Sequence, residues 1–175
     1  MNAEPTRRTP TAKLRAYLLL AAGGMIGGLA GGRPQLAALA APFAAYVALG
    51  IALERRPRLT IRAEDRPERT LEGEDIACDL RLQASSAIHR LELELRPGAG
   101  VTPRVPERQV LALGEGEERE LRIIARAARW GVRHLGTISC RVYDRFGLIQ
   151  YELDPVSLGV VSVFPRGETL RELIN

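Results

Sequence analysis

Side chains that could carry out chemistry are few and lie far apart in this 175-residue sequence. The two histidines, His89 and His134, have no cysteine or aspartate at the spacing of a metal-ligand set. Asp144 and Asp154 could act together as a general acid and base, but they stand on an expected loop and at an expected strand end, where carboxylates commonly cap turns. The sequence also lacks a nucleophile elbow, a phosphate-binding loop and a dinucleotide fingerprint. We therefore predict that the protein is not an enzyme and has no catalytic residues, cofactor or metal site.

The two cysteines, Cys78 and Cys140, are the remaining reactive groups, and no CxxC motif contains either of them. Each lies on the apolar side of a segment in which apolar and polar residues alternate. A free cysteine in such a position behaves as a small hydrophobic residue. We expect two buried, reduced thiols and no disulfide.

Basic charge is concentrated in the N-terminal third of the sequence. Residues 1–56 hold seven basic and two acidic side chains, whereas residues 57–175 hold 18 basic and 19 acidic ones. In the second part the arginines alternate with glutamate and aspartate, as on solvated faces. We therefore predict no nucleic-acid partner.

Two long uncharged runs follow the first arginines. Residues 16–32 and 36–53 contain no charged side chain and show no polar stripe. Each run approaches the length that a bilayer requires. The sequence predicts transmembrane helices over 14–32 and 36–53, joined by a short external loop over 33–35, with the lipid bilayer as partner.

The distribution of basic residues predicts how this hairpin is oriented. Residues 1–13 form a basic tail, further arginines follow the second run, and only Arg33 lies between the runs. By the positive-inside rule this predicts a multi-pass protein of the cell inner (plasma) membrane with both termini cytoplasmic. The alternative for this region is a cleaved export signal ending near residues 38–40, which would release an exported enzyme.

Six glycines in the first run form two interleaved stripes with a spacing of four residues. They are Gly23, Gly27 and Gly31 in one stripe and Gly24, Gly28 and Gly32 in the other. Small residues at this spacing let two helix backbones approach closely inside a membrane. We predict that these glycines pack against the second apolar run of the same chain; a homo-oligomer formed through the glycine face is the alternative.

After Pro57 the sequence changes to short alternating segments separated by turns rich in glycine and proline. In residues 90–96, for example, every second residue is leucine and the residues between are charged. Strands are expected over residues 59–63, 75–83, 90–96, 109–113, 118–126, 135–143, 148–153 and 158–164. The predicted fold class is a membrane-anchored all-β protein: a two-helix transmembrane hairpin followed by an immunoglobulin-like antiparallel β-sandwich over residues 57–165 and a C-terminal tail over 166–175.

Three short motifs within the expected sandwich are more specific than its composition. They are Arg129-Trp130-Gly131 with Gly136 shortly after it, Tyr143-Asp144-Arg145-Phe146-Gly147-Leu148, and Val163-Phe164-Pro165. Together with the hairpin they resemble the bacterial family of unknown function number fifty-eight, whose members often neighbour a MoxR-type AAA+ ATPase. The chain departs from the family pattern at Trp130, which is inserted, and at Thr137 and Arg145, which stand where proline is usual; Phe164 replaces a tyrosine.

The resemblance implies a membrane anchor, a sandwich and a MoxR-type AAA+ ATPase as protein partner. It also implies a von Willebrand A-like domain on the C-terminal side of the sandwich. Trp130 is predicted to be an exposed anchor for a partner, whereas Asp144, Phe146 and Gly147 have a purely structural alternative in shaping a turn. The remaining family-motif or interface positions are Arg129, Gly131, Gly136 and Pro165.

The function predicted from these features is a non-catalytic, membrane-anchored protein-interaction scaffold. The alternative is an accessory or regulatory subunit of a membrane enzyme or transporter complex.

Overall fold

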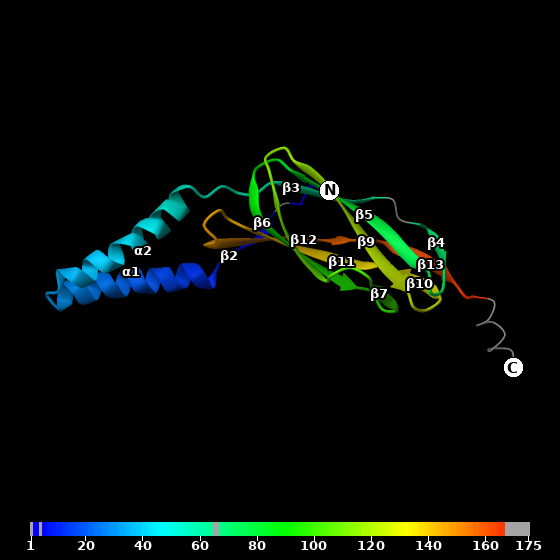
Figure 1. The fold of residues 1–175 in the computed structure, drawn as a ribbon, viewed down its shortest axis with the longest axis horizontal. Helices are drawn as coiled ribbons and strands as arrows, with labels where there is room; N and C mark the ends of the chain where they lie inside the picture. The colour runs from blue at the N-terminus through cyan, green and yellow to red at the C-terminus, as the bar shows by residue number, and fades with distance from the viewer. Residues whose placement is uncertain (1, 4, 65–66, 167–175) are drawn as a thin grey trace.

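Two helices form a hairpin that projects from one end of a β domain (Figure 1). The computed structural model describes residues 2–3, 5–64 and 67–166. Helix α1 spans Ala12–Ala30 and α2 spans Pro34–Ala52. The turn between the helices contains Gly32 at φ +59°, a left-handed conformation that favours glycine.

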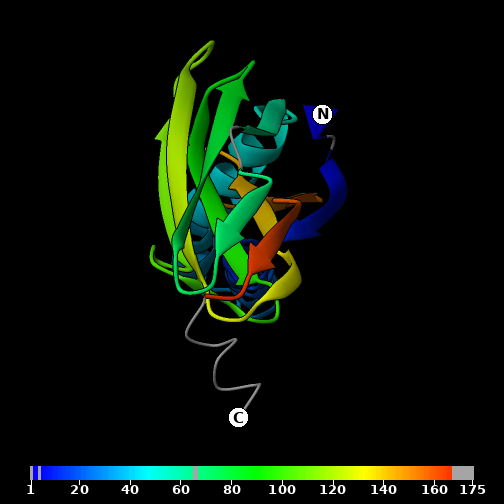
Figure 2. The same cartoon turned by 90° about the vertical axis from the view of Figure 1, so that its right-hand side faces the viewer.

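The β domain consists of two five-stranded sheets packed face to face (Figure 2). The first sheet has the order β1 (Asn2–Ala3), β3 (Leu59–Glu64), β5 (Asp75–Ala84), β9 (Glu118–Ala127) and β7 (Val101–Pro103). The second has the order β2 (Pro5–Pro10), β12 (Ile149–Ser157), β11 (Gly136–Tyr143), β6 (Ile88–Pro97) and β8 (Arg108–Leu113). The neighbours within both sheets are antiparallel. The order β3-β5-β9 facing β12-β11-β6 is the Greek-key arrangement of immunoglobulin-like sandwiches.

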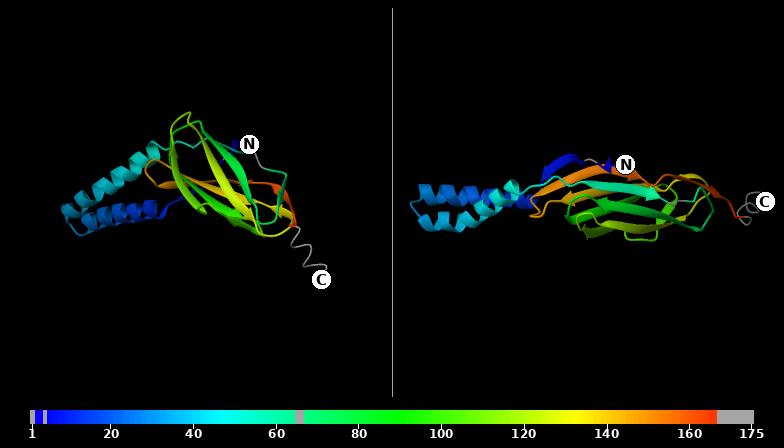
Figure 3. Two further views of the ribbon diagram at one scale, coloured as in Figure 1. Left: turned by 45° about the vertical axis from the view of Figure 1, so that its right-hand side comes forward. Right: turned by 90° about the horizontal axis from the view of Figure 1, so that it is seen from above.

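A third, smaller sheet lies at the end of the sandwich remote from the hairpin (Figure 3). Its order is β10 (Gly131–His134), β13 (Val160–Phe164) and β4 (Arg69–Leu71), with β10 antiparallel and β4 parallel to β13. The expected strand over residues 158–164 therefore leaves the main sandwich and forms the middle of this small sheet.

The alternating apolar side chains of both sheets meet in one core. In β5 these are Ile76, Cys78, Leu80 and Leu82, which are 3% exposed or less. Cys140 of β11 is also buried, and neither cysteine takes part in a disulfide, which confirms the prediction of buried reduced thiols. Burial raises the pKa of the Cys140 thiol to about 12.

The outer face of the second sheet is polar, with one buried carboxylate. Glu92 accepts hydrogen bonds from Arg90 (2.6 Å) and Arg108 (2.7 Å), and the hydroxyl of Tyr143 also donates to it (3.3 Å). Burial alone would raise the pKa of Glu92, but the hydrogen bonds from the two arginines outweigh burial and lower it.

Within the region expected as a basic tail over 1–13, residues 2–3 and 5–10 are strands of the two sheets. Residues 5–10 form β2, which pairs with β12 through Pro10↔Ile149 and Thr9↔Gln150. Asn2 and Ala3 form β1 beside β3. The hairpin therefore begins from a strand of one sheet and returns, through α2 and β3, into the other. At the other end of the chain, most of the expected tail over 166–175 lies outside the described residues.

The prediction of a multi-pass protein of the inner membrane with both termini cytoplasmic is contradicted by the properties of the helices. Both expected helices are present, but among the described residues only α2 is long and apolar enough to be a candidate span, with a mean hydropathy of 1.7 and 17% of its apolar window buried. Helix α1 carries Lys13 and Arg15 within its first turn and includes several glycines, which lower its hydropathy. The predicted span over 14–32 left Lys13 outside the helix and accepted Arg15 within it, whereas the helix includes both basic residues.

Candidate functional site

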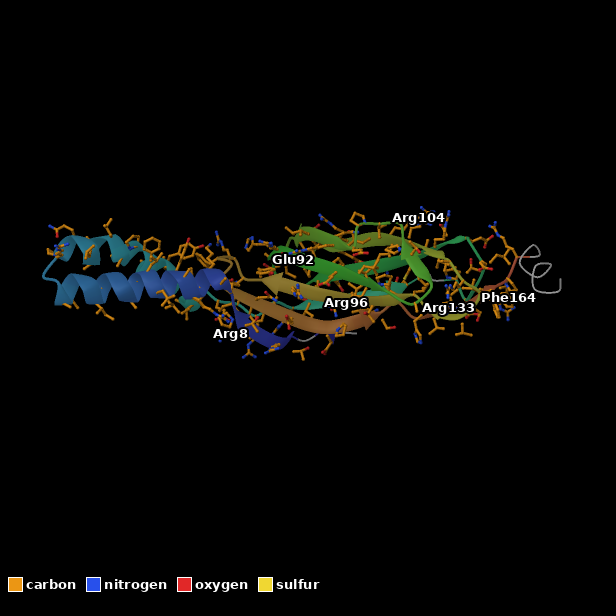
Figure 4. The ribbon with its side chains drawn as sticks, turned by 90° about the horizontal axis from the view of Figure 1, so that it is seen from below. Arg8, Glu92, Arg96, Arg104, Arg133 and Phe164 are labelled. Carbon is orange, nitrogen blue, oxygen red and sulfur yellow. The ribbon has the colours of Figure 1, made fainter. Side chains whose placement is uncertain are left out.

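The structure separates the predicted site residues into two groups at opposite ends of the sandwich. The hairpin end has Asp144, Phe146 and Gly147, the distal end has Arg129, Trp130, Gly131 and Pro165, and Gly136 stands at the start of β11. Figure 4 shows the same separation, with Arg8 beside the hairpin and Arg133 and Phe164 at the far end. These residues do not form one site.

The turn between β11 and β12 holds the start of α1. Asp144 shapes this turn: its side chain accepts a hydrogen bond from the backbone N–H of Phe146 (3.2 Å) and its carbonyl accepts one from Gly147 (3.0 Å). Gly147 has φ +67°, which requires a residue tolerant of the left-handed region. Thr11, the N-cap of α1, donates its backbone N–H to the carbonyl of Leu148 (2.9 Å). The helix therefore starts directly on the turn.

An aromatic cluster fills the space between the hairpin and this turn. The rings of Tyr46 and Phe146 lie 5.5 Å apart, and Tyr17 meets Tyr46 at 5.3 Å and Phe43 at 5.4 Å, all edge to face. Lys13 donates to the hydroxyl of Tyr46 (2.8 Å) and to the carbonyl of Phe146 (2.9 Å). These contacts assign Phe146 to docking the hairpin on the sandwich.

Glu54, just after α2, forms the second connection between hairpin and sandwich. It accepts hydrogen bonds from the Nε (2.9 Å) and Nη2 (2.6 Å) of Arg8 in β2 and from the buried hydroxyl of Tyr151 in β12. Burial would raise the pKa of Glu54, but the bonds from Tyr151 and Arg8 outweigh burial and lower it. Burial and the carboxylate of Glu54 raise the pKa of Tyr151 to about 12.

The glycine stripes of α1 face different surroundings. A methyl group added at Gly24 would lie 2.5 Å from Cβ of Ala40, and one at Gly28 would lie 2.9 Å from the backbone nitrogen of Ala37, so both glycines pack against α2. Gly23 has no atom within 4 Å of such a methyl group and points away from α2. The other stripe members are Gly27, whose added methyl would meet only the side chain of Leu36 at 3.9 Å, and Gly31 and Gly32, which follow the last residue of α1.

We expect Gly24→Leu to loosen the hairpin and Gly23→Leu to leave it intact, because only the first side chain would enter the space occupied by α2. Overpacking of this kind weakens a helix contact by about 2 kcal/mol, which is roughly a thirtyfold change in an opening equilibrium. Amide hydrogen exchange of α1 and α2 in detergent, measured by mass spectrometry, would show this acceleration for Gly24→Leu alone. Equal exchange in both variants would show that the two glycines have equivalent surroundings.

The outer face of the small distal sheet carries exposed apolar side chains beside Arg69, Ser162 and His134. Across this sheet Val132 pairs with Ser162, His134 with Val160, and Phe164 with Leu71, while Val161 and Val163 face the core. Five large apolar side chains lie on or beside the outer face: Leu71 (42% exposed), Trp130 (50%), Val132 (72%), Val160 (41%) and Phe164 (48%). We call these five residues the distal apolar patch. Exposed apolar side chains gathered on one face are typical of interaction surfaces.

A hollow of about 590 Å³ adjoins the patch, between Glu72 after β4 and the residues at the start of β10. It is lined by Glu72, Arg129, Trp130, Gly131, Val132 and Arg133. The Nη2 of Arg133 donates to the carbonyl of Trp130 (2.9 Å), whereas its Nε is buried and has no hydrogen-bond partner in the described part of the chain. The guanidinium group of Arg133 lies beside two glycines. A Cβ added at Gly100 would be 3.5 Å from the Nε of Arg133, and a Cβ added at Gly131 would be 3.9 Å from it. A buried donor without a partner is uncommon in folded proteins.

Within residues 2–3, 5–64 and 67–166 there is no group of three histidine, cysteine, aspartate or glutamate side chains that could hold a metal ion. His89 and His134 are exposed and belong to different strands, β6 and β10.

Sequence reasoning identified Trp130 but missed the rest of the distal apolar patch. Leu71, Val132 and Phe164 come from three separate segments, and only the pairing of β10, β13 and β4 brings them together. The alternation within residues 160–164 was a usable signal, because it leaves Val160 and Phe164 on the face opposite the buried valines.

Comparisons with known proteins identify no family for this chain. No family model and no curated protein matches this chain. The CARDB domain of the PF1109 protein of Pyrococcus furiosus is 13% identical, with a TM-score of 0.40, 62% of this chain and 89% of that chain covered. The sporulation control protein Spo0M of Bacillus subtilis is 13% identical at a TM-score of 0.32, with 66% and 53% covered. A β-glucosidase of Listeria innocua is 15% identical at a TM-score of 0.36, with 61% of this chain but only 16% of the enzyme covered. These values are too low to transfer a function.

Proposed function

We propose that this protein is a non-catalytic adaptor, attached to a membrane through its helical hairpin and binding a protein partner with its distal apolar patch. The observation that carries the proposal is the apolar surface of the hairpin. Its exposed large hydrophobic side chains are Leu18, Leu19, Leu20, Met25, Ile26, Leu29, Leu36, Leu39, Leu49, Ile51 and Leu53. A soluble monomer rarely leaves so much contiguous apolar surface in water.

The exposed side chains surround the hairpin, which favours lipid over a protein groove as the covering. Leu18, Leu19 and Leu20 are consecutive in α1 and each is 47–74% exposed. Consecutive helical residues point about 100° apart, so these three face different directions. A protein groove would cover one side of such a hairpin, whereas acyl chains can cover all of it.

Hydrogen bonds connect both helices of the hairpin to the sandwich, so the hairpin can hold the sandwich at a fixed position. Thr11 and Lys13 tie α1 to the turn between β11 and β12, and Glu54 ties the end of α2 to β2 and β12. The distal apolar patch is then held at the end of the sandwich remote from the attached helices (Figure 1). The resemblance to the MoxR-associated family makes a MoxR-type AAA+ ATPase the first protein partner to test.

Vesicle flotation tests the attachment. We expect the purified full chain to float with phosphatidylcholine vesicles, and the triple variant Leu19→Gln, Ile26→Gln, Leu29→Gln to lose at least about tenfold in bound fraction, since each change removes apolar area from the lipid contact. The matched control, Trp130→Gln with Val132→Gln, should float like the wild type. Wild-type protein that stays out of the floating fraction would refute the proposal.

An accessory subunit of a membrane complex is the second candidate, favoured by the open side of α1. Gly23 has nothing within 4 Å of its added Cβ, so another helix backbone could approach it closely. In this case Gly23→Leu would release the chain from a larger complex on native electrophoresis of solubilised membranes, while vesicle flotation would remain unchanged. An unaltered complex would count against this second function.

A further inference from the structure

We propose that a hollow at the junction of the hairpin and the sandwich binds the phosphate headgroup of an anionic phospholipid, with Arg55 and Arg145 holding the phosphate. We call this space the junction hollow; its lining includes Leu53, Arg55, Arg145 and Phe146. The inference rests on the proposed function, because it takes the hairpin to lie in lipid. It goes further by specifying the class of lipid and the residues that select it.

The position and size of the junction hollow supply the first argument. It has a volume of about 350 Å³ and lies at the end of the sandwich from which the hairpin projects (Figure 1). This volume is within the range of about 300–1,000 Å³ that is usual for small-molecule sites. Leu53, which ends α2 and is 60% exposed, lines the hollow and continues the apolar surface of the hairpin. A headgroup in the hollow would therefore have its acyl chains beside the lipid-covered helices.

Two arginines from separate segments supply the second argument. Arg55 follows α2, and Arg145 lies in the turn between β11 and β12; both line the junction hollow and are exposed. Neither takes part in an ion pair among the described residues. Guanidinium groups suit phosphate because two of their N–H groups can donate to two phosphate oxygens at once.

Three carboxylates also line the junction hollow, but two of them already have partners within the protein. Glu54 accepts the hydrogen bonds that join the end of α2 to the sandwich. Asp144 accepts the backbone N–H groups of Phe146 (3.2 Å) and Ile149 (2.7 Å). The third, Glu115, is exposed in the turn between β8 and β9. The two arginines outnumber this remaining carboxylate, which leaves the hollow with an excess of positive charge.

Further basic residues around the junction hollow favour an anionic headgroup over a zwitterionic one. Arg15 lies in the first turn of α1, Arg56 and Arg58 lie in the segment after α2, and all three are exposed. Basic residues close to a bilayer surface are attracted to anionic lipids. A zwitterionic headgroup carries an ammonium group beside its phosphate, and these cations would repel it.

Vesicle flotation with two lipid compositions tests the inference. The probes are vesicles of phosphatidylcholine alone and vesicles that also contain about 30% phosphatidylglycerol. We expect the full chain to prefer the vesicles with phosphatidylglycerol. The double variant Arg55→Gln, Arg145→Gln should bind these vesicles about twentyfold more weakly, since each arginine contributes about fivefold. Its binding to phosphatidylcholine alone should equal that of the wild type, because the apolar surface of the hairpin is unchanged.

A charge-matched control separates the junction hollow from the overall charge of the protein. Arg69→Gln with Arg104→Gln removes the same charge from two exposed arginines away from the hairpin and should leave binding to both vesicles unchanged. Far-UV circular dichroism establishes that both double variants are folded. Equal binding of the wild type to both compositions, or equal losses in the two double variants, would overturn the inference.

A change of buffer distinguishes a lipid phosphate from a free anion. Replacing chloride by inorganic phosphate at constant ionic strength should leave the preference for phosphatidylglycerol intact, because a free anion lacks the acyl chains that hold a headgroup at the hollow. Loss of the preference in phosphate would show that the hollow takes a free anion, and the lipid assignment would be wrong.

These results can be told apart from failure of the proposed function. If the wild type floats equally with both vesicle compositions, the membrane attachment stands and only the headgroup site is rejected. If it floats with phosphatidylglycerol alone and loses this binding in the Arg55→Gln, Arg145→Gln variant, the headgroup site stands and attachment through the apolar hairpin falls. If it floats with neither, both are rejected.

Discussion

Gly136→Ala is expected to lower the free energy of unfolding by about 3 kcal/mol or more, although it adds only one methyl group. Gly136 has φ +129°, which L-residues with a side chain rarely adopt. Its added Cβ would also collide with the backbone carbonyl of Arg96 and lie 3.0 Å from Cα of Pro97. Because β11 and β6 are paired at this point through Gly136↔Pro97, neither backbone can move away without breaking the ladder.

Gly116→Ala is the matched control for that experiment. Gly116 also has a positive φ, +73°, but nothing lies within 4 Å of its added Cβ. This substitution should therefore show backbone strain alone, about 1 kcal/mol. Urea denaturation followed by far-UV circular dichroism measures both values. Similar losses for the two variants would mean that the approach of Arg96 to Gly136 has no energetic consequence.

Glu54→Gln is expected to destabilise the protein by about 2 kcal/mol at neutral pH and by much less at pH values well below the ordinary pKa of glutamate. The side chain of Glu54 is 17% exposed and accepts hydrogen bonds from Arg8 and Tyr151. Those bonds hold its pKa in the folded state below the ordinary value of 4.5, despite the opposing effect of burial. A carboxyl group with a lowered folded pKa stabilises the fold above its unfolded pKa, and this contribution disappears as the pH falls through the folded pKa.

The measurement is the free energy of unfolding of wild type and variant at neutral and acidic pH. The two proteins should differ at about pH 7, and the difference should shrink as the pH falls below the ordinary value of 4.5 and through the lowered folded pKa, because protonated Glu54 resembles glutamine in charge. Glu118→Gln serves as control, since the side chain of Glu118 is 52% exposed and its pair with Arg81 is solvated. A Glu54→Gln difference that stays constant down to about pH 3 would show that the lost contacts do not depend on the charge of Glu54.

Alternation of apolar and polar residues was sufficient to locate the long strands, because each has one face in the common core. Residues 75–83 and 118–126, for example, were expected as strands and lie within β5 and β9. The short strands β4, β7 and β10 have three or four residues, too few for alternation to be visible. Strand β2 begins and ends with proline and was missed because only the exposed edge of β12 makes it a strand.

The candidate site was less accessible to sequence reasoning than the fold. Composition could nominate Trp130 as an unusual residue, but its exposure depends on how the chain turns between β9 and β10. The buried position of the Arg133 Nε depends on the approach of Gly100 from a distant segment, which no local pattern encodes. The basic residues of the first helical turn misled the membrane assignment, since Lys13 is engaged by Tyr46 and Phe146 within the protein.

Strand β2 of the second sheet leads into the hairpin, and the hairpin leads into β3 of the first sheet (Figure 3). Both sheets are therefore connected directly to the helices. Tension applied to the helices would load the ladders β2-β12 and β3-β5 at the same time. The strands run roughly along the direction of pull, so the load acts as shear across many backbone hydrogen bonds together. A module built in this way resists tension on its helices without first unravelling from one end.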